Sequence, residues 1–318
     1  MRPVILSLLG IDVPAYFAML TIGFALATWI GARQVARLGL DREVIIDLGL
    51  AMVIAGVVGS RILHVIADGY FWDYVHLCTD PSKVDWHISR SHCLHRTVDG
   101  LWDQARGVCH PREANCFAWA AFWAGGLTYY GGLIGATGYA VYFLRREGFP
   151  FLKAADMAGF GVALGLAWGR MGCFLAGCCF GVEHHGPLAA YFPPWSPASE
   201  AQFKTHKLHS ESFAALPVHP TQLYEAVGCF VIALAAYALV TPRKRYDGQV
   251  FLFFLVTYSV LRALIEVLRN DDRGGLLGLS TSQLISVLIT VAAIPASRYF
   301  RARAEAIRQF RDTPSTVG

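Results

Sequence analysis

The sequence predicts an all-α polytopic membrane protein with seven transmembrane helices. Of its 318 residues, 55% are hydrophobic and 16% are charged, and the mean hydropathy is +0.43. Ordinary soluble domains contain roughly 25% charged residues. The apolar residues form runs of about 20, the length that an α-helix needs to cross a bilayer core of about 30 Å. Basic clusters separate these runs, so we exclude a soluble protein and expect residues 1–318 to form a single transmembrane domain.

Seven apolar segments are long enough to span the membrane. Their continuous runs favour helices, because β-barrel strands would alternate apolar and polar residues. We expect spans at about 13–31, 45–66, 119–144, 155–177, 220–240, 249–268 and 281–299. The first segment follows Arg2, as a signal peptide would. It is long for a signal core and leads directly into basic residues, so we expect an uncleaved membrane helix.

Basic residues near the span ends predict the orientation, because Lys and Arg collect in connections that stay in the cytoplasm. Here they follow the first, third, fifth and seventh spans. The residues are Arg33, Arg37, Arg42, Arg145, Arg146, Lys153, Arg243, Lys244, Arg245, Arg298, Arg301, Arg303, Arg308 and Arg311. We therefore expect the N-terminus outside and the C-terminal tail, 300–318, in the cytoplasm.

This orientation places two long loops, 67–118 and 178–219, outside the membrane. The first contains Cys78, Cys93, Cys109 and Cys116. An oxidising compartment favours two disulfides, and four cysteines allow three pairings that the sequence leaves open. A metal site competes, because the same loop contains His76, His87, His92, His95 and His110. The loop has no CxxC pair, so we expect disulfides.

Charged residues inside the predicted spans indicate a polar cavity. An arginine at the centre of a membrane helix costs at least about 2.5–3.5 kcal/mol. The embedded or span-edge residues are Arg61, Arg170, Arg262, Asp156, Glu225 and Glu266. Arg262 and Glu266 are four residues apart, so they share a helical face and can pair. A self-neutralising ion pair is one interpretation. The alternative is a phosphate site, because the planar guanidinium fork suits phosphate, and an embedded phosphate belongs most simply to a phospholipid head group.

Glycine is the second unusual feature of the spans. The chain has 31 glycines, and they cluster at 125–138 and 159–181. Small residues allow membrane helices to approach closely. A broken or re-entrant segment that lines a cavity is the alternative, and both interpretations stay open.

Five stretches in order along the chain then carry a family resemblance: GSRI at 59–62, GGLTYYGGLIG at 125–135, GRMGCF at 169–174, HPTQLYE at 219–225 and YSVLRALIEVLR at 258–269. Together they resemble the phosphatidylglycerol–prolipoprotein diacylglyceryl transferases of the bacterial inner membrane. The resemblance implies transfer of the diacylglyceryl group from phosphatidylglycerol to a lipobox cysteine thiol of a prolipoprotein. It also implies a multi-pass inner-membrane protein with its active site towards the periplasm.

The resemblance assigns roles to particular residues. Arg170 matches the signature arginine, Arg262 the arginine of the later helix, and Glu266 the glutamate one turn beyond it. Tyr16 matches a tyrosine of the first span, and Gly181 a signature glycine. The catalytic candidates are His219, Arg170, Arg262, Tyr130 and Glu266. The candidates for binding phosphatidylglycerol are Arg170, Arg262, Tyr16, Arg61 and Gly181.

The reaction explains why such residues are needed. A cysteine thiol has a pKa near 8.5 and must become a thiolate to act as a nucleophile. Negative charge grows on the departing phosphate, and fixed guanidinium groups stabilise it. His219 is a candidate base, because its ordinary pKa of about 6.5 lies near the working pH; a structural histidine beside Pro220 is the alternative. We expect no cofactor, no metal and no nucleic acid partner, and a monomer.

Two departures from the family pattern leave alternatives open. Tyr130 occupies the position of a histidine that precedes paired glycines, so a non-catalytic lipid-binding relative is a second hypothesis. Cys173, Ala176 and Cys178 replace two asparagines and a glutamate of the signature block. With Cys179, these cysteines are packing residues, disulfide-forming or reactive thiols of a membrane redox protein, or metal ligands. His184 and His185 are the nearby candidates for additional metal ligands.

Overall fold

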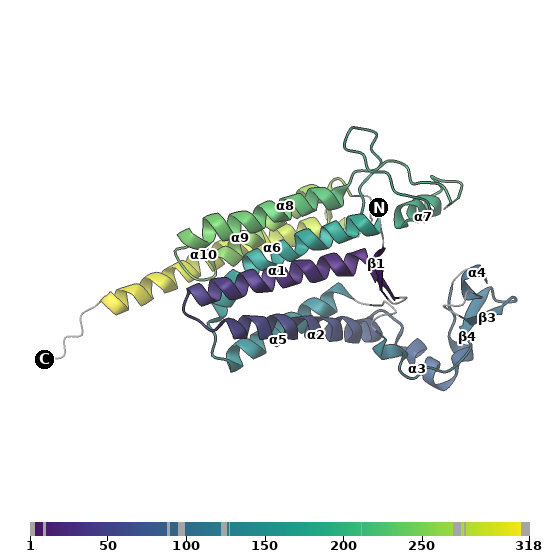
Figure 1. Cartoon of the computed structure of the whole chain (residues 1–318), viewed down its shortest axis with the longest axis horizontal. Coiled ribbons are helices and arrows are strands. Elements are labelled where there is room, and N and C mark those ends of the chain that lie inside the picture. Colours follow the sequence, from purple (N-terminus) through teal and green to yellow (C-terminus); the bar gives the residue numbers. More distant parts are fainter. Residues whose placement is uncertain are drawn as a thin grey trace. The chain divides into compact units, whose positions relative to one another are not determined.

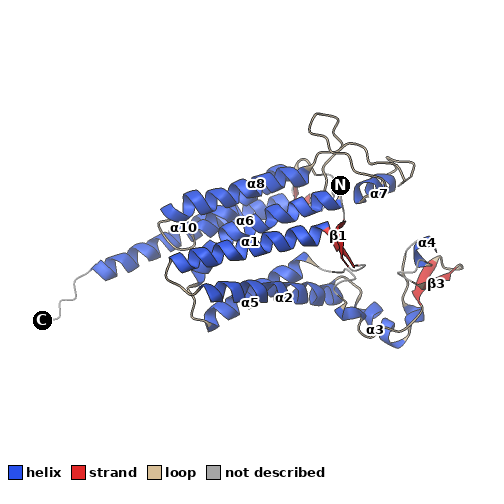
Figure 2. Cartoon of the chain, in the orientation of Figure 1, coloured by secondary structure: helices blue, strands red, loops and turns tan. Residues whose placement is uncertain are grey.

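The computed structural model of the chain describes residues 4–8, 11–87, 90–94, 99–121, 126, 128–210, 212–269, 275–276 and 278–312. His95, Gly125 and the tail residues 313–318 lie outside these ranges, as does the side chain of His92. Internal contacts group the chain into two compact units, Met1–Ile46 with Pro150–Gly318, and Asp47–Phe149. Figure 1 shows the path of the chain, and Figure 2 shows that helices make up most of both units.

The larger unit is a bundle of long helices whose neighbours pack side by side (Figure 1). Its long helices are α1 (Ala15–Arg37), α6 (Phe151–Ala176), α8 (Thr221–Ala235), α9 (Gln249–Glu266) and α10 (Thr281–Asp312). After α8 the chain continues as a π-helical turn, η4 (Ala236–Val240), and a 3₁₀ turn, η5 (Thr241–Arg243). The shorter elements are β1 (Val4–Leu8), β2 (Ile11–Pro14), α7 (Pro197–Lys204), β5 (Gly275–Leu276) and β6 (Leu279–Ser280).

The smaller unit contains most of α2 (Arg42–Ala67) together with α5 (Tyr129–Arg146) and the long loop between them. The loop elements are α3 (Phe71–Thr79), η1 (Pro81–Lys83), α4 (Arg90–Cys93), β3 (Gly100–Asp103), β4 (Val108–Pro111) and η2 (Ala118–Ala120). Strands β3 and β4 form an antiparallel hairpin. Disulfides join Cys78 to Cys116 and Cys93 to Cys109, so the expectation of two disulfides is confirmed and the pairing is fixed.

Six helices among the described residues are long and apolar enough to cross a membrane. They correspond to α1, α2, α6, α8 with its two following turns, α9 and α10. The span that we expected at about 119–144 is not among these six helices. Its helix, α5, begins only at Tyr129. Its first half is rich in glycine and tyrosine, which lowers its hydropathy. Helix α10 continues through Asp312 into the expected tail, 300–318, whose cytoplasmic location stays a prediction.

The embedded Asp156 is used to join helices of the larger unit. Its carboxylate is buried in α6, where it lies 2.7 Å from Lys244 Nζ and accepts a hydrogen bond of 2.9 Å from the backbone N–H of Val250. Val250 is in the first turn of α9, where backbone N–H groups lack helical partners. Burial alone would lower the pKa of Lys244, but hydrogen bonds to Asp156 and Asp247 outweigh it and raise that pKa. Asp156 therefore caps the first turn of α9, and Lys244 supplies the positive charge that its buried carboxylate requires.

Glycines of α2 and α5 allow these two helices to approach closely. A Cβ atom at Gly135 would lie 2.5 Å from the carbonyl oxygen of Ala55 and 3.1 Å from the Cα of Gly59. Ser60 and Thr128 add reciprocal hydrogen bonds, in which each hydroxyl donates to the other residue's carbonyl at 2.6 and 3.1 Å. The close-packing interpretation of this glycine cluster is therefore confirmed.

This packing predicts different effects for two substitutions in the same helix. Gly135→Ala forces α2 and α5 apart, so we expect the free energy of unfolding to fall by about 1–3 kcal/mol. Gly138 faces open space within the described structure, and Gly138→Ala should be neutral or stabilise by up to about 1 kcal/mol through helix propensity. Thermal unfolding of the purified protein in detergent measures both. Equal effects of the two variants would contradict the packing described for Gly135.

Candidate active site

A buried charge cluster joins three helices of the larger unit. Arg170 of α6 places its Nε 2.9 Å from Glu225 Oε2 on α8, a charge contact without hydrogen-bond alignment. The hydroxyl of Tyr258 on α9 donates to Glu225 Oε1 at 3.0 Å. Glu225 is fully buried, whereas Arg170 is partly exposed. The sequence predicted these charges in the spans, but it did not predict that Arg170 and Glu225 are partners.

The second embedded arginine pairs within its own helix, as the spacing predicted. Arg262 Nη2 lies 2.5 Å from Glu266 Oε2, one turn further along α9, and donates to Ser282 Oγ of α10 at 3.3 Å. The other terminal nitrogen, Nη1, is buried and has no hydrogen-bond partner among the described residues. Buried donors are usually paired, so this N–H group is available to an anion that enters the site.

Gly181 holds the loop after α6 against the ends of two helices. Its N–H donates to the carbonyl of His219 at 2.9 Å, and the N–H of Val182 donates to Leu268 at 2.9 Å. A Cβ atom at Gly181 would collide with the Leu268 carbonyl oxygen and with Thr221. The close approach explains the glycine, so its contribution to the site is to position the loop.

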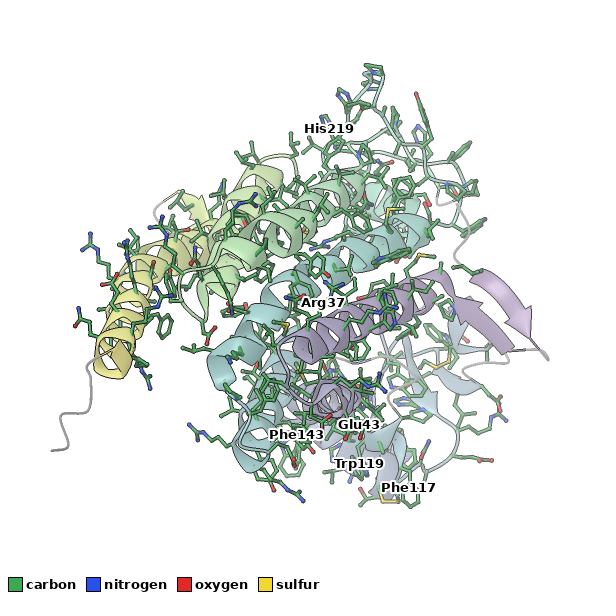
Figure 3. The ribbon with its side chains drawn as sticks, turned by 60° about the vertical axis from the view of Figure 1, so that its left-hand side comes forward. Arg37, Glu43, Phe117, Trp119, Phe143 and His219 are labelled. Atoms are coloured by element: carbon green, nitrogen blue, oxygen red, sulfur yellow. A yellow bond between two sulfur atoms is a disulfide. The ribbon has the colours of Figure 1, made fainter. Side chains whose placement is uncertain are left out.

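His219 lies in the segment that leads into α8 (Figure 3). Its ring stacks on His184, with centroids 3.8 Å apart, and its Nδ1 lies 3.3 Å from the hydroxyl oxygen of Tyr224. Partial loss of hydration and, second, the charge of His184 lower the pKa of His219. The imidazole is therefore neutral at pH 7 and able to accept a proton.

Tyr16 and the three cysteines lie close to Arg170. A Cβ atom at Gly172 would lie 3.0 Å from Tyr16 Cα, so α1 and α6 are in contact there. The Tyr16 hydroxyl interacts electrostatically with Arg170 and with the thiols of Cys173, Cys178 and Cys179. The three sulfur atoms lie within 4.8 Å of one another. The structure thus brings these thiols to the arginine that the sequence singled out.

Two polar residues that the sequence patterns did not single out hold the cysteine loop in place. Thr221 Oγ1 donates to the carbonyl of Cys179 at 2.9 Å, and Gln222 Nε2 donates to the carbonyl of Cys178 at 2.7 Å. Both side chains are buried at the start of α8. Their position directly after His219-Pro220, within the HPTQLYE motif, could have identified them as candidate site residues.

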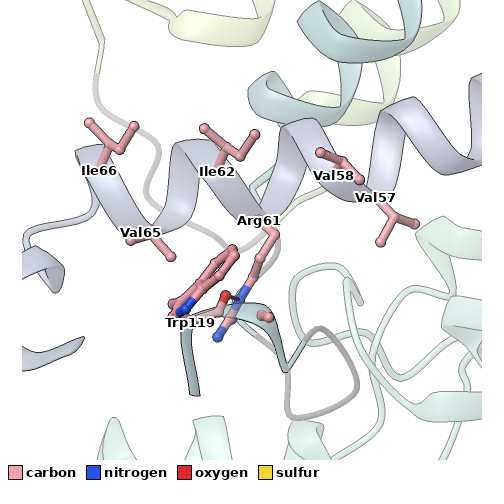
Figure 4. A pocket seen from close by; sticks show the side chains of 8 residues that line it. Val57, Val58, Arg61, Ile62, Val65, Ile66 and Trp119 are labelled. Carbon is pink, nitrogen blue, oxygen red and sulfur yellow. Dashed lines mark hydrogen bonds between the residues drawn. The ribbon is translucent and has the colours of Figure 1, made fainter. Parts of the chain in front are cut away.

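Arg61 and Tyr130 belong to the smaller unit. The Arg61 guanidinium is buried and donates to the carbonyls of Trp119, Ala118 and Gly126 at 2.6, 2.7 and 3.1 Å. It also donates to the hydroxyl of Tyr74 at 3.0 Å. Figure 4 shows Arg61 reaching from α2 towards Trp119, at one wall of a cavity of about 310 Å³ lined mostly by aliphatic side chains of α2. These bonds make Arg61 hold a loop against α2, and its contact with a phosphate stays a prediction.

Tyr130 stands in the first turn of α5 and is 58% exposed. Its ring makes an edge contact with Tyr129. The remaining site candidates, Tyr16, Arg170, Gly181, His219, Arg262 and Glu266, all lie in the larger unit. They come from the start of α1, the second halves of α6 and α9, and the loop that enters α8.

Comparison with known proteins decides the family. A model of the family described as prolipoprotein diacylglyceryl transferase matches residues 3–87 and 108–298. The chain belongs to this prolipoprotein diacylglyceryl transferase family. The match omits residues 88–107, which include Cys93 and strand β3, so this part of the disulfide-linked loop is additional to the family pattern.

Several relatives carry the name phosphatidylglycerol–prolipoprotein diacylglyceryl transferase. The chain is 26% identical to that of Clostridium tetani, over 92% of this chain and 96% of the relative. It is 28% identical to the second such protein of Clostridium perfringens, over 92% and 93% of the two chains. It is also 28% identical to that of Dehalococcoides mccartyi, over 92% and 91%.

The Arg170–Glu225 contact predicts how this transferase-family protein responds to loss of one charge. Glu225→Ala leaves a largely buried guanidinium without its carboxylate, so the free energy of unfolding should fall by about 3–5 kcal/mol. Arg170→Met combined with Glu225→Leu removes both charges and should restore most of that loss. Thermal unfolding in detergent compares these two variants with the native chain. A double variant no more stable than Glu225→Ala would show that the two side chains are not paired.

Proposed function

We propose that the protein transfers the diacylglyceryl group of phosphatidylglycerol to the lipobox cysteine of a prolipoprotein. A thioether forms and glycerol phosphate leaves. Membership of the family and the names of the relatives support the general activity. The single structural observation that carries the proposal is the pair of arginines, Arg170 and Arg262, within apolar helices of one unit. An embedded positive charge with an unpartnered N–H group suits an anionic lipid head group.

Arg170 and Arg262 act as the phosphate clamp in this proposal. The phosphate of the lipid accepts from the free Nη1 of Arg262 and lies in the field of Arg170, whose side chain is partly exposed. Glu225 and Glu266 hold the two guanidinium groups in place. As the bond from the glycerol carbon to phosphate breaks, the charge on the departing oxygen grows, and fixed guanidinium groups in a low-dielectric site stabilise that transition state.

The acceptor thiol must lose its proton before its sulfur attacks the glycerol carbon. His219 is the proposed base, because it is neutral at pH 7 and sits on the loop that Gly181 fixes beside the site. Tyr16 lines the same region at the start of α1. Tyr130, in the histidine position of the family, is a hydrogen-bonding residue in this proposal and not a base, because a phenol has a pKa of about 10.

The membrane arrangement follows from the same reasoning. We place the N-terminus outside and the C-terminus in the cytoplasm of a bacterial inner membrane, with α5 as the seventh span. The basic residues of 33–42, 145–153 and 243–245 support this orientation. The site then faces the periplasm, where the ends of α6 and α9 and the start of α8 meet the loop 178–219. The protein acts as a monomer in this proposal.

Complementation tests the proposed activity. The chain is expressed in cells depleted of their own transferase, and lipidation of a reporter lipoprotein is followed by its gel mobility. We expect the native chain to restore the lipidated form, and Arg170→Ala and Arg262→Ala each to lower transfer at least about 100-fold by removing transition-state stabilisation. Arg243→Ala, which changes an exposed arginine outside the site, should leave transfer unchanged.

The outcomes separate two functions. No mobility shift despite normal membrane expression contradicts transfer, and near-normal lipidation by either site variant contradicts the clamp. Phosphatidylglycerol that co-purifies with a chain unable to transfer supports the alternative, a non-catalytic lipid-binding relative. Restoration of transfer to such a chain by Tyr130→His would show that the missing histidine is the cause.

The proposed base predicts a pH dependence. Protonated His219 cannot accept a proton, and its pKa is lowered, so the transfer rate should fall only below about pH 6.5. His219→Gln should lower the rate and abolish this acid limb. His184→Gln removes a neighbouring charge that lowers the pKa, so the limb should move to higher pH. An unchanged acid limb in His219→Gln would assign His219 a structural role.

A further inference from the structure

Three free cysteines lie together where α6 ends, beside Arg170. The sulfur atoms of Cys173, Cys178 and Cys179 lie within 4.8 Å of one another. We propose that these three thiols, as thiolates, bind a zinc ion whose fourth position is open to the acceptor thiol. Zinc–sulfur bonds are about 2.3 Å long, so the sulfurs of a tetrahedral site are about 3.8 Å apart. The sulfur–sulfur distances in the structure exceed that spacing by at most about 1 Å.

The backbone around the thiols is held in an unusual conformation. Gly177 ends α6 with φ of 79°, and Cys179 has φ of 62°, a left-handed conformation that residues with a side chain rarely adopt. Such strain persists only where the surroundings fix it. Here the buried Thr221 and Gln222 bind the carbonyls of Cys179 and Cys178. Two residues with left-handed backbone, Gly177 and Cys179, therefore let the chain turn after α6 so that sulfurs from α6 and from the loop meet.

The charges around the cluster fit a thiolate site. Three thiolates and Zn²⁺ carry a net charge of −1, and two arginines compensate it. The side chain of the buried Arg269 donates a hydrogen bond to Cys179, and Arg170 interacts with the same thiol electrostatically. Hydrogen bonds from outer residues orient metal ligands and are part of built metal sites. A cluster of neutral packing residues would gain nothing from two neighbouring cations.

A disulfide explains the cluster less well than a metal does. The same chain forms two disulfides in its long loop, yet Cys173, Cys178 and Cys179 are free in the structure. A disulfide would use two of the three sulfurs and leave the third unexplained, and adjacent Cys178 and Cys179 cannot bridge without strain. Zinc accepts sulfur ligands, has no redox chemistry and requires a fourth ligand when the protein supplies three.

The fourth ligand gives the site its role, and this step rests on the proposed transferase function. The acceptor thiol binds zinc as a thiolate, and its proton passes to His219, the proposed base. Its sulfur then forms a bond to the glycerol carbon, while the bond from that carbon to phosphate oxygen breaks. Glycerol phosphate leaves with that electron pair, and zinc stays Zn²⁺. The metal makes the thiolate without the histidine that Tyr130 replaces, which links the two departures from the family pattern.

Metal analysis of the purified full-length chain tests the site without any turnover. We expect about one zinc ion per chain in protein from zinc-supplied cells, and cobalt substitution should give sulfur-to-cobalt charge-transfer absorption. Cys173→Ser and Cys179→Ser should each lose most of the bound zinc. Cys229→Ala, at a buried free cysteine of α8 outside the cluster, should keep it. In the native chain, the three thiols should resist alkylation until a chelator removes the metal.

Three results would overturn the site: no zinc above that of the cysteine variants, a disulfide within the cluster, or equal alkylation before and after chelation. Transfer assays separate this inference from the proposed function. Bound zinc without transfer supports the site and contradicts the transferase function. Transfer that continues at an unchanged rate after zinc has been removed overturns the role of the metal while the transferase function stands.

Discussion

The charge contact between Arg170 and Glu225 is the interaction on which the rest of this structure depends. A guanidinium within an apolar helix is unfavourable unless an anion accompanies it. Glu225 provides that anion from α8, and Tyr258 holds the same carboxylate from α9. Three helices are therefore fixed to one another by a group that also faces the proposed lipid phosphate. Arg170 thus serves helix packing and, in the proposed function, catalysis, so we expect loss of Glu225 to affect both.

The two embedded arginines differ in the partners that hold them. Arg262 is paired with Glu266 of its own helix, so this ion pair does not depend on how neighbouring helices pack. Arg170 depends on a contact between helices. In the proposed function, a lipid phosphate would accept from the second terminal nitrogen of Arg262, which lacks a protein partner among the described residues. Such a site is organised before the lipid arrives, which is what transition-state stabilisation requires.

Local sequence patterns predicted the membrane helices, the embedded charges and the i, i+4 pair of Arg262 and Glu266. They did not predict contacts that depend on how helices pack, such as Arg170 with Glu225 or the loop bonds of Arg61. We predicted the span at about 119–144 from its apolar content alone. The helix in this segment is shorter, and Gly135 and nearby glycines allow it to pack closely against α2. The proximity of the three thiols depends on the left-handed backbone at Gly177 and Cys179, and a cysteine rarely signals such a conformation.

The most direct test of the central claim uses the purified chain, phosphatidylglycerol and a synthetic peptide that contains a lipobox cysteine. Mass spectrometry of the peptide and quantification of released glycerol phosphate measure both products of one reaction. We predict that the peptide gains a diacylglyceryl group by a thioether bond, with one glycerol phosphate released for each modified peptide. The Arg170→Ala variant should form neither product. Lipid that binds to the chain while the peptide mass stays unchanged would contradict the proposed transfer.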